Sequence, residues 1–425
     1  MKLTSYWLDT AKPAGDFRHQ ELPASVDVAV VGGGLTGLST ALHLARQGAS
    51  VAVLEAHTLG WGASGRNGGM ATTGLAIDFT KAVKRYGLDS ATRMFTVYND
   101  AIDTVEDVVR TEGIDCDFER VGKLNLASKP AHYEEFQRSA DLLALHANHE
   151  VTLVPRNRIR DEIGSDFYHG AMVDPLAAGV HVGKLCSGLA MAASQYGASL
   201  HEDCEVVSLE RLGTRRHRVV TAQGSLLADD VVVGTSGYSG KLLPWLRRRI
   251  VPIGSFIVVT EPLDRAVIDE LLPHRRVASD SKNLVYYFRI TPDNRLLFGG
   301  RARFAMSSPG SDLRSGDILR RAITKVFPRL RGVGIDYCWG GLVDMSLDQM
   351  VHAGRRDGVF YSVGYSGHGV QMATHMGKVV AQMLEGDHSA NPWGELPFHA
   401  VPGHVGPPWF LPPVGAYFRF LDLVK

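Results

Sequence analysis

The sequence predicts an α/β protein in which a Rossmann-type domain on a parallel sheet is interleaved with a second domain built on a mostly antiparallel sheet. Residues 26–56 follow the order strand, glycine-rich turn, helix, strand. Residues 358–386 repeat a strand, a glycine-rich turn and a long helix. Between these units, residues 245–345 contain strand-like runs rich in arginine and aromatic residues, broken by a helical stretch at 315–327. The parallel domain is therefore predicted to be discontinuous in sequence.

The first unit carries the residue types that a dinucleotide requires. Val28–Val31 is a short apolar strand, and the turn after it has glycines at 32, 34 and 37 in the pattern G-x-G-x-x-G. Glycine permits the tight turn and the close approach of a pyrophosphate, and the helix N-terminus offers free N–H groups to it. Glu55 ends the second strand, where a carboxylate accepts hydrogen bonds from ribose hydroxyls and repels a 2′-phosphate. These residues alone predict FAD or NAD as the ligand.

Three later stretches place glycine or other small residues after strands. Residues 60–74 hold six glycines around Ser64, Arg66 and Asn67, which indicates backbone held against a flat or bulky group. The buried strand 231–233 ends in small residues, where a second chain segment can pass beneath a pyrophosphate; these are Thr235, Ser236 and Gly237. Strand 359–363 leads through a glycine turn into a helix, so a second helix N-terminus is aimed at an electron-rich group.

The composition excludes several other classes of protein. Lys plus Arg and Asp plus Glu both number 45, so no net charge draws the chain to nucleic acid or anionic lipid. The four cysteines are scattered without a C-x-x-C pair, which argues against a disulfide framework or a zinc site and suits a reducing cytoplasm. The chain shows no signal-peptide core and no apolar run of about 18 residues. We expect a cytoplasmic protein with no metal, no transmembrane segment and no nucleic-acid partner.

The pattern of elements also predicts domain boundaries. Helical periodicity occupies residues 78–112 and 131–149, an alternating strand pair occupies 115–127, and a helix occupies 184–196. The nucleotide-binding domain is predicted to comprise residues 1–77, 150–240 and 350–390, and the second domain residues 78–149 and 241–349. Residues 391–425, which are rich in proline and aromatic side chains, are predicted to form a packed C-terminal tail.

These stretches, in this order, resemble the FAD-dependent oxidoreductases of the D-amino-acid oxidase superfamily, which includes glycine oxidase and monomeric sarcosine oxidase. The resemblance covers residues 28–55, 60–69, 206–237 and 358–386. Within the superfamily, the chain resembles the gamma-glutamylputrescine oxidase group. That similarity rests on S-Y-W near Ser5, G-A-S-G-R-N-G-G at 62–69, Y-Y-F-R at 286–289, W-G-G at 339–341 and G-Y-S-G-H-G-V at 364–370. The resemblance implies an FAD-binding Rossmann-type domain with an interleaved substrate domain.

The resemblance also implies which residues hold FAD. The ADP half would be held by Gly32, Gly34, Leu35, Thr36, Gly37, Glu55 and Ala56, with Val207 against the adenine. The isoalloxazine would be lined by Ser64, Arg66, Asn67, Gly68, Gly69 and Met70, and its pyrimidine end by Gly364, Gly367, His368, Gly369, Val370 and Gln371. The flavin-linking cysteine of the sarcosine oxidases would fall near Gly341, and Cys338 lies three residues too early. We therefore expect noncovalent FAD.

Two departures from the superfamily bear on the substrate. Relatives that act on amino acids carry an arginine in a G-L-R-P segment, whereas this chain reads Gly341-Leu342-Val343-Asp344. Sarcosine oxidases place a lysine where Gln371 stands. The loss of both cations argues against a small α-amino acid, and Asp344 would suit a cationic amine. The alternative for Asp344 is a turn or cap residue.

The strand predicted at residues 286–289 adds three candidates. Tyr287 and Arg289 share one face of this strand because side chains alternate, and Tyr286 lies on the other face. By resemblance Tyr287 would lie over the flavin, while Arg289 would bind a remote carboxylate or pair with an acid in the sheet. The candidate catalytic residues are Tyr286, Tyr287, Arg289, Asp344 and Gln371.

The predicted function is FAD-dependent oxidation of an amine C–N bond to an imine and then an aldehyde, with O2 reduced to H2O2. The substrate would be a gamma-glutamylated polyamine or another primary or secondary amine. One alternative is a dehydrogenase that passes electrons to a quinone or carrier protein. A second is a nonenzymatic FAD-binding protein.

Overall fold

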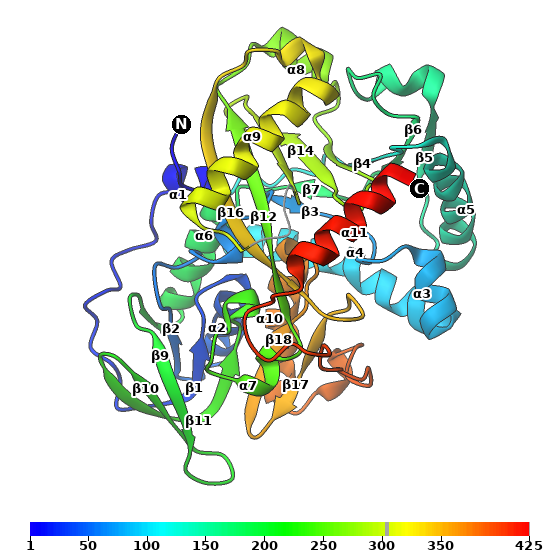
Figure 1. Ribbon diagram of the computed structural model, residues 1–425. Coiled ribbons are helices and arrows are strands. Elements are labelled where there is room, and N and C mark those ends of the chain that lie inside the picture. The colour runs from blue at the N-terminus through cyan, green and yellow to red at the C-terminus, as the bar shows by residue number, and fades with distance from the viewer. Residues whose placement is uncertain (302–305, 425) are drawn as a thin grey trace.

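The computed structural model describes residues 1–301 and 306–424 (Figure 1). Residues 302–305 of the predicted second domain and residue 425 of the predicted tail lie outside the described residues. Two large sheets form the frame of the molecule, and a two-stranded sheet, β3 (Met70–Ala71) with β7 (Ala178–Gly179), joins segments that are far apart in the sequence.

The first large sheet is mainly parallel, and its central strands are buried on both faces, as their continuous apolar sequences require. Its strand order is β17-β18-β11-β1-β2-β8, and only the β17–β18 pair on this path is antiparallel. The strands are β1 (Ser25–Val31), β2 (Val51–Leu54), β8 (Ser199–His201), β11 (Gly224–Val233), β17 (His352–Arg356) and β18 (Val359–Val363). A hairpin of β9 (Val206–Arg211) and β10 (His217–Thr221) extends β11. The predicted Rossmann-type sheet is confirmed.

The second large sheet is antiparallel except where β13 pairs with β4, and its order is β16-β12-β15-β14-β13-β4-β6-β5. Its strands are β4 (Lys123–Leu126), β5 (Thr152–Pro155), β6 (Gly170–Asp174), β12 (Val251–Thr260), β13 (Val277–Asp280), β14 (Tyr286–Ile290), β15 (Leu296–Gly300) and β16 (Ile335–Met345). The predicted mostly antiparallel sheet is therefore confirmed.

Helices cover both sheets. The helices α2 (Leu35–Arg46), α4 (Leu88–Thr111), α6 (Val182–Gln195) and α10 (Gly369–Leu384) share one hydrophobic core with β1 and β2. The remaining helices are α1 (Tyr6–Thr10), α3 (Phe79–Tyr86), α5 (Pro130–Ala147), α7 (Pro244–Arg247), α8 (Arg265–Leu271), α9 (Pro309–Val326) and α11 (Leu411–Val424).

Two segments differ from the sequence-based expectation. Residues 115–127 do not form a strand pair: Gly122 has φ +72°, its N–H donates to the Ala177 carbonyl, and only β4 is a strand. Strands β5 and β6 lie in the second sheet, which favours a resumption of the nucleotide-binding domain near Ala178 rather than at residue 150. The domain division itself stays a prediction.

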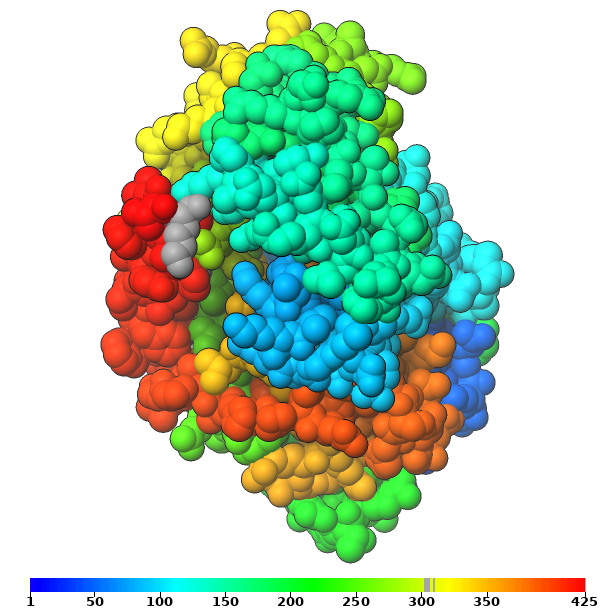
Figure 2. Space-filling view, turned by 90° about the vertical axis from the view of Figure 1, so that its right-hand side faces the viewer, coloured from blue at the N-terminus to red at the C-terminus, as the bar shows by residue number. Residues whose placement is uncertain are grey.

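The predicted C-terminal tail ends in helix α11, which crosses the front of the molecule (red in Figure 1). Leu411 is buried at its start, whereas Tyr417, Phe420 and Leu423 are exposed, so the tail is only partly packed. Across the described residues, no helix has both the length and the apolar character needed to cross a membrane. In Figure 2 the C-terminal segment (red) and the segment around α3 (blue) lie on either side of a hollow.

Candidate active site

Two helix N-termini converge at one cavity. The helices α2 and α10 approach closely because glycine stands at the contact: a Cβ at Gly377 would lie 2.5 Å from the Ser39 Cβ. The Ser39 hydroxyl donates to the Thr374 carbonyl at 2.6 Å, and the Thr36 and Tyr365 hydroxyls share a hydrogen bond of 2.7 Å. The free N–H groups at both helix starts therefore favour negative charge at the same place.

The predicted glycine turn has the geometry that its residues imply. Gly32 has φ +106°, and a Cβ at Gly37 would lie 2.0 Å from the Gly32 carbonyl oxygen. The Glu55 carboxylate accepts hydrogen bonds from the N–H groups of Gly33, at 2.7 Å, and His57, at 3.0 Å. Burial raises the pKa of Glu55. Glycine is required here for backbone packing, and Glu55 is held at the end of its strand.

The second predicted glycine-rich stretch is a tightly bonded loop. The Asn67 amide donates to the carbonyls of Ala63 and Ser64 and accepts from the Gly69 N–H at 2.8 Å. Arg66 donates to the Trp61 carbonyl at 2.7 Å and the Gly340 carbonyl at 3.2 Å. The Ser64 hydroxyl accepts from the Leu35 N–H at 2.9 Å, which connects this loop to the start of α2.

Buried side chains brace the loop from behind. The Trp7 indole donates to the Asn67 carbonyl at 2.8 Å, and the Trp339 indole donates to the Arg66 carbonyl at 2.9 Å. The Ser5 hydroxyl donates to the Gly65 carbonyl at 2.5 Å. No role at the site was predicted for Trp7 or Ser5, and the only signal for it in the sequence was the S-Y-W start itself.

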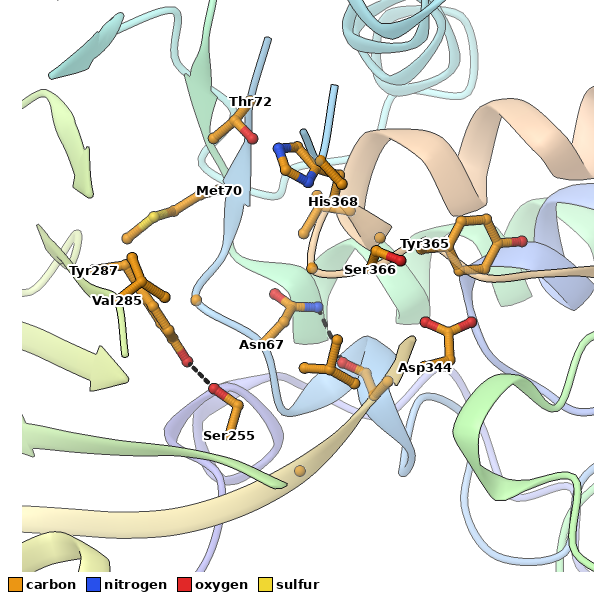
Figure 3. Close-up of a pocket in the computed structure, with 18 of the residues that line it drawn as sticks. Asn67, Met70, Thr72, Ser255, Val285, Tyr287, Asp344, Tyr365, Ser366 and His368 are labelled. Carbon is orange, nitrogen blue, oxygen red and sulfur yellow. Dashed lines mark hydrogen bonds between the residues drawn. The ribbon is translucent and has the colours of Figure 1, made fainter. Parts of the chain in front are cut away.

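The loop and the two helix starts border a cavity of about 490 Å³, which is shown in Figure 3. Tyr287 and Ser255 lie on one side of it, and Asp344, Tyr365 and His368 lie on the other. The predicted residues that line it are Leu35, Thr36, Ser64, Arg66, Asn67, Gly68, Met70, Ser236, Tyr287, Asp344, Gly367, His368, Gly369 and Val370.

Tyr287 lies where the cavity meets the glycine-rich loop. A Cβ at Gly68 would lie 3.1 Å from its ring, and its hydroxyl shares a hydrogen bond of 2.9 Å with the Ser255 hydroxyl. Burial raises the pKa of Tyr287 to about 12, so the phenol stays protonated and shapes the cavity rather than accepting a proton.

Two further predicted residues lie at the α10 end of the cavity. Burial lowers the pKa of His368 to about 3, with Lys123 and Arg301 adding to the effect, so its imidazole is neutral. The Asp344 carboxylate accepts from the Gly364 N–H at 2.7 Å. Asp344 thus acts as a turn-bracing residue that also faces the cavity, and burial raises its pKa to about 6.

Several predicted residues do not line the cavity. The Arg289 guanidinium is buried and donates to the carbonyls of Gly69, Val180 and Ile290, so it neither faces a substrate nor pairs with an acid in the sheet. Gln371 donates to the Thr72 carbonyl at 2.5 Å behind β3. Tyr286 packs against Phe298 on the opposite sheet face, with ring centroids 5.3 Å apart.

The remaining predicted residues outside the cavity wall lie near the glycine turn or at the rim of the first sheet. They are Gly32, Gly34, Gly37, Glu55, Ala56, Gly69, Val207, Thr235, Gly237 and Gly364. Val207 is 55% exposed on β9, and its contact with the adenine stays a prediction. The Cys338 thiol is buried away from the cavity, where it donates to the Asp312 carbonyl at 3.3 Å.

Four charged residues of the cavity wall were missed by sequence reasoning: Lys123, Asp280, Lys282 and Arg301. Lys282 lies 2.8 Å from Asp280, whose pKa is raised to about 6 by burial. No short motif marks these positions, because they meet only through the pairing of β4, β13, β14 and β15.

A glycine turn under one helix, a second helix aimed at the same point and a cavity with an aromatic wall define a dinucleotide-dependent enzyme. A profile of the FAD dependent oxidoreductase family, DAO, matches residues 27–383. Gamma-glutamylputrescine oxidoreductase of Escherichia coli K12 is 34% identical over 403 residues, which cover 94% of this chain and 93% of that protein. The chain belongs to the family of FAD-dependent oxidoreductases, and the predicted resemblance is confirmed.

Solved structures share the fold. L-proline dehydrogenase from P. horikoshii superposes with a TM-score of 0.70 at 19% identity, over 88% of this chain and 96% of that one. Glycine oxidase from Geobacillus kaustophilus superposes with a TM-score of 0.70 at 21% identity, over 90% of this chain and 99% of that one.

FAD is the cofactor of this family, and the residues present fit it. The turn at Gly32 and Gly37 leaves no room for side chains, as backbone that faces a pyrophosphate requires. The His368 Nδ1 atom is buried at the start of α10 without a hydrogen-bond partner among the described residues. Glu55 and the start of α2 would hold the ADP half, and residues 64–70 with 367–370 would border the isoalloxazine.

Proposed function

We propose that this enzyme oxidises a primary or secondary amine, the class to which gamma-glutamylated polyamines belong. A primary amine, O2 and water would give the aldehyde, ammonia and H2O2, through an imine that water hydrolyses. When bound, FAD supplies the two-electron oxidation of the C–H bond next to the amine nitrogen. Its attachment is proposed to be noncovalent because Cys338 is buried away from the cavity.

The observation that carries this proposal is the cavity wall at residues 341–344. Leu342 and Val343 line the cavity at the segment where relatives that act on amino acids place an arginine. A short α-amino acid would therefore lack its bidentate carboxylate partner there. The similarity to gamma-glutamylputrescine oxidoreductase supports an amine as the alternative.

The residues of this chain would contribute orientation and exclusion of water. The Tyr287 ring, held by Ser255, limits the approach of the substrate to the side of Gly68. Neutral His368 places no positive charge beside an incoming amine, and the N-terminus of α10 favours negative charge at its end of the cavity. The four cysteines are buried free thiols, which supports a reducing, cytoplasmic location.

The test is anaerobic titration of the purified holoenzyme, with the visible flavin absorbance as the readout. Gamma-glutamylputrescine, free polyamines, secondary N-alkyl amines and D-amino acids are added in parallel, and air is then admitted. We expect bleaching by an amine and rapid recolouring in air. Bleaching only by D-amino acids or sarcosine would overturn the substrate class. Slow recolouring would instead favour a dehydrogenase with a quinone or protein acceptor, and failure of every amine would favour a nonenzymatic protein.

A further inference from the structure

Two cationic residues, Lys123 and Arg301, lie on the face of the second large sheet that also carries Tyr287. In the register of the second sheet, Lys123 lies opposite Val277, while Tyr287 lies opposite both Ser279 and Gly299. Because side chains alternate along a strand, Lys123 shares the face of Tyr287, and so does Arg301, two residues beyond Gly299. Both cations line the cavity, and the strands β4 and β15 lie three steps, or about 14 Å, apart.

Both cations line the cavity that the start of α10 also borders. Both Lys123 and Arg301 contribute to the low pKa of His368. A Cβ at Gly367 would lie 4.0 Å from the Arg301 Nη2 atom. The anion-favouring helix start and two cationic side chains therefore face one region of the cavity.

Within residues 1–301 and 306–424, neither cation forms an ion pair. The nearby carboxylates are committed elsewhere. Asp174 accepts from the His149 imidazole at 2.7 Å and the Thr73 hydroxyl at 2.5 Å, and Asp280 pairs with Lys282 at 2.8 Å. Burial lowers the pKa of both Lys123 and Arg301, and the opposing attractions of Asp174 on Lys123 and of Tyr287 on Arg301 offset this only in part. An anionic ligand group would offset the rest of this cost of burial.

We propose that Lys123 and Arg301 form a carboxylate subsite, so that the preferred substrates are amines that carry a carboxylate remote from the oxidised carbon. This inference rests on the proposed amine oxidation. Neither residue lies in the segment at 341–344 or at position 371, which are the two places where relatives in the superfamily carry an arginine or a lysine. A glutamyl group has the required chemistry, because it carries a carboxylate several bonds away from the reacting amine.

A matched pair of substrates isolates the carboxylate. Gamma-glutamylputrescine is compared with N-(4-aminobutanoyl)putrescine, which is the same amide without the α-carboxylate. We expect the wild-type holoenzyme to prefer the acidic substrate by about tenfold or more in kcat/KM. Lys123→Met and Arg301→Met should each lower kcat/KM for the acidic substrate by about tenfold, mainly through KM, and leave the other within about twofold.

Controls separate this role from folding and from cofactor binding. Lys325→Met, on α9 outside the cavity, should preserve the preference. Where a methionine variant lacks flavin or unfolds, Lys123→Arg and Arg301→Lys should retain the preference in a folded holoenzyme. Equal losses on both substrates, or no preference in the wild type, would overturn the carboxylate subsite while the amine oxidation stands. If neither amine bleaches the flavin, the proposed function itself is wrong.

Discussion

The hydroxyls of Thr36 and Tyr365 lie 2.7 Å apart and share a hydrogen bond between two segments that are far apart in the sequence. Thr36 belongs to the first turn of α2, and Tyr365 belongs to the loop that leads into α10. The Tyr365 hydroxyl also shares a hydrogen bond of 2.9 Å with Ser362. This buried bridge fixes the two helix starts relative to each other, and both of them border the cofactor end of the cavity.

Tyr365→Phe should therefore weaken FAD binding while the fold remains intact. The change removes the bridge and leaves the Thr36 hydroxyl without its partner, at a cost of about 1 to 2 kcal/mol. We expect the dissociation constant for FAD to rise by about tenfold in a fluorescence titration of apoprotein. Tyr361→Phe, a half-buried tyrosine of the neighbouring β18, is the matched control. Equal affinity of the Tyr365 variant and the wild type would contradict a role for the bridge.

Much of the cofactor end could be predicted because its determinants are local. The glycines at 32 and 37 stand within one turn, and the chemistry of a βαβ unit follows from their spacing. The strand predicted at 359–363 coincides with β18, and the strand predicted to end at Glu55 is β2, since continuous apolar runs mark strands buried on both faces. The family and its FAD cofactor follow from these same stretches.

The substrate end could not be predicted in the same way. Alternation correctly places Tyr287 and Arg289 on one strand face, but nothing local shows that Gly69 and Val180 lie above Arg289. Lys123 and Arg301 line the same cavity because the sheet places their strands, β4 and β15, on either side of β13 and β14. Register between distant strands depends on the whole fold, so no motif at either cation marks it.

Arg289→Lys tests the positioning role that the structure gives this arginine. Its guanidinium binds three carbonyls, and burial lowers its pKa to about 10. The ammonium of lysine cannot donate to three carbonyls in the planar geometry of a guanidinium. We therefore expect the free energy of unfolding to fall by about 2 kcal/mol or more and FAD to bind more weakly. Denaturant unfolding of the holoenzyme measures the first effect.

The same variant distinguishes support of the loop from substrate recognition. The ratio of kcat/KM between the acidic substrate and its decarboxylated analogue should stay at the wild-type value, since Arg289 does not line the cavity. A selective loss on the acidic substrate would instead restore Arg289 as a carboxylate ligand.

The C-terminal helix is predicted to hold one wall of the cavity in place. The Asp422 carboxylate accepts from the N–H groups of Asn283 and Leu284, at 2.8 and 2.9 Å, and from the Asn283 amide at 2.8 Å. Phe418, one helical turn earlier, lines the cavity together with Asn283. Asp422→Ala should raise KM for the amine about threefold to tenfold with a smaller change in kcat, because the wall loses its anchor.

Arg419→Ala, an exposed change on the same helix, is the control for Asp422 and should leave KM unchanged. Limited proteolysis should cleave the Asp422 variant in the tail earlier than the wild type. Identical KM values in both variants would show that α11 is not needed for substrate binding.

Asp344 should make the folded protein less stable as the pH rises. Burial raises its folded-state pKa to about 6, above the ordinary value of 3.8, so the folded state binds the proton more tightly than the unfolded chain does. This contribution to stability is complete below about pH 4 and is lost as the pH passes through about 6.

Asp344→Asn keeps an oxygen that can accept the Gly364 N–H and removes the ionisation. The stability difference, variant minus wild type, should therefore grow in favour of the variant between about pH 4 and 6, by roughly 1.4 kcal/mol for each unit that separates the two pKa values. Asp280, whose pKa is also raised by burial, is present in both proteins and cancels in the difference. Thermal unfolding of both holoenzymes across this range measures it, and a difference that is constant or falls with pH would show that the Asp344 carboxylate is not desolvated as described.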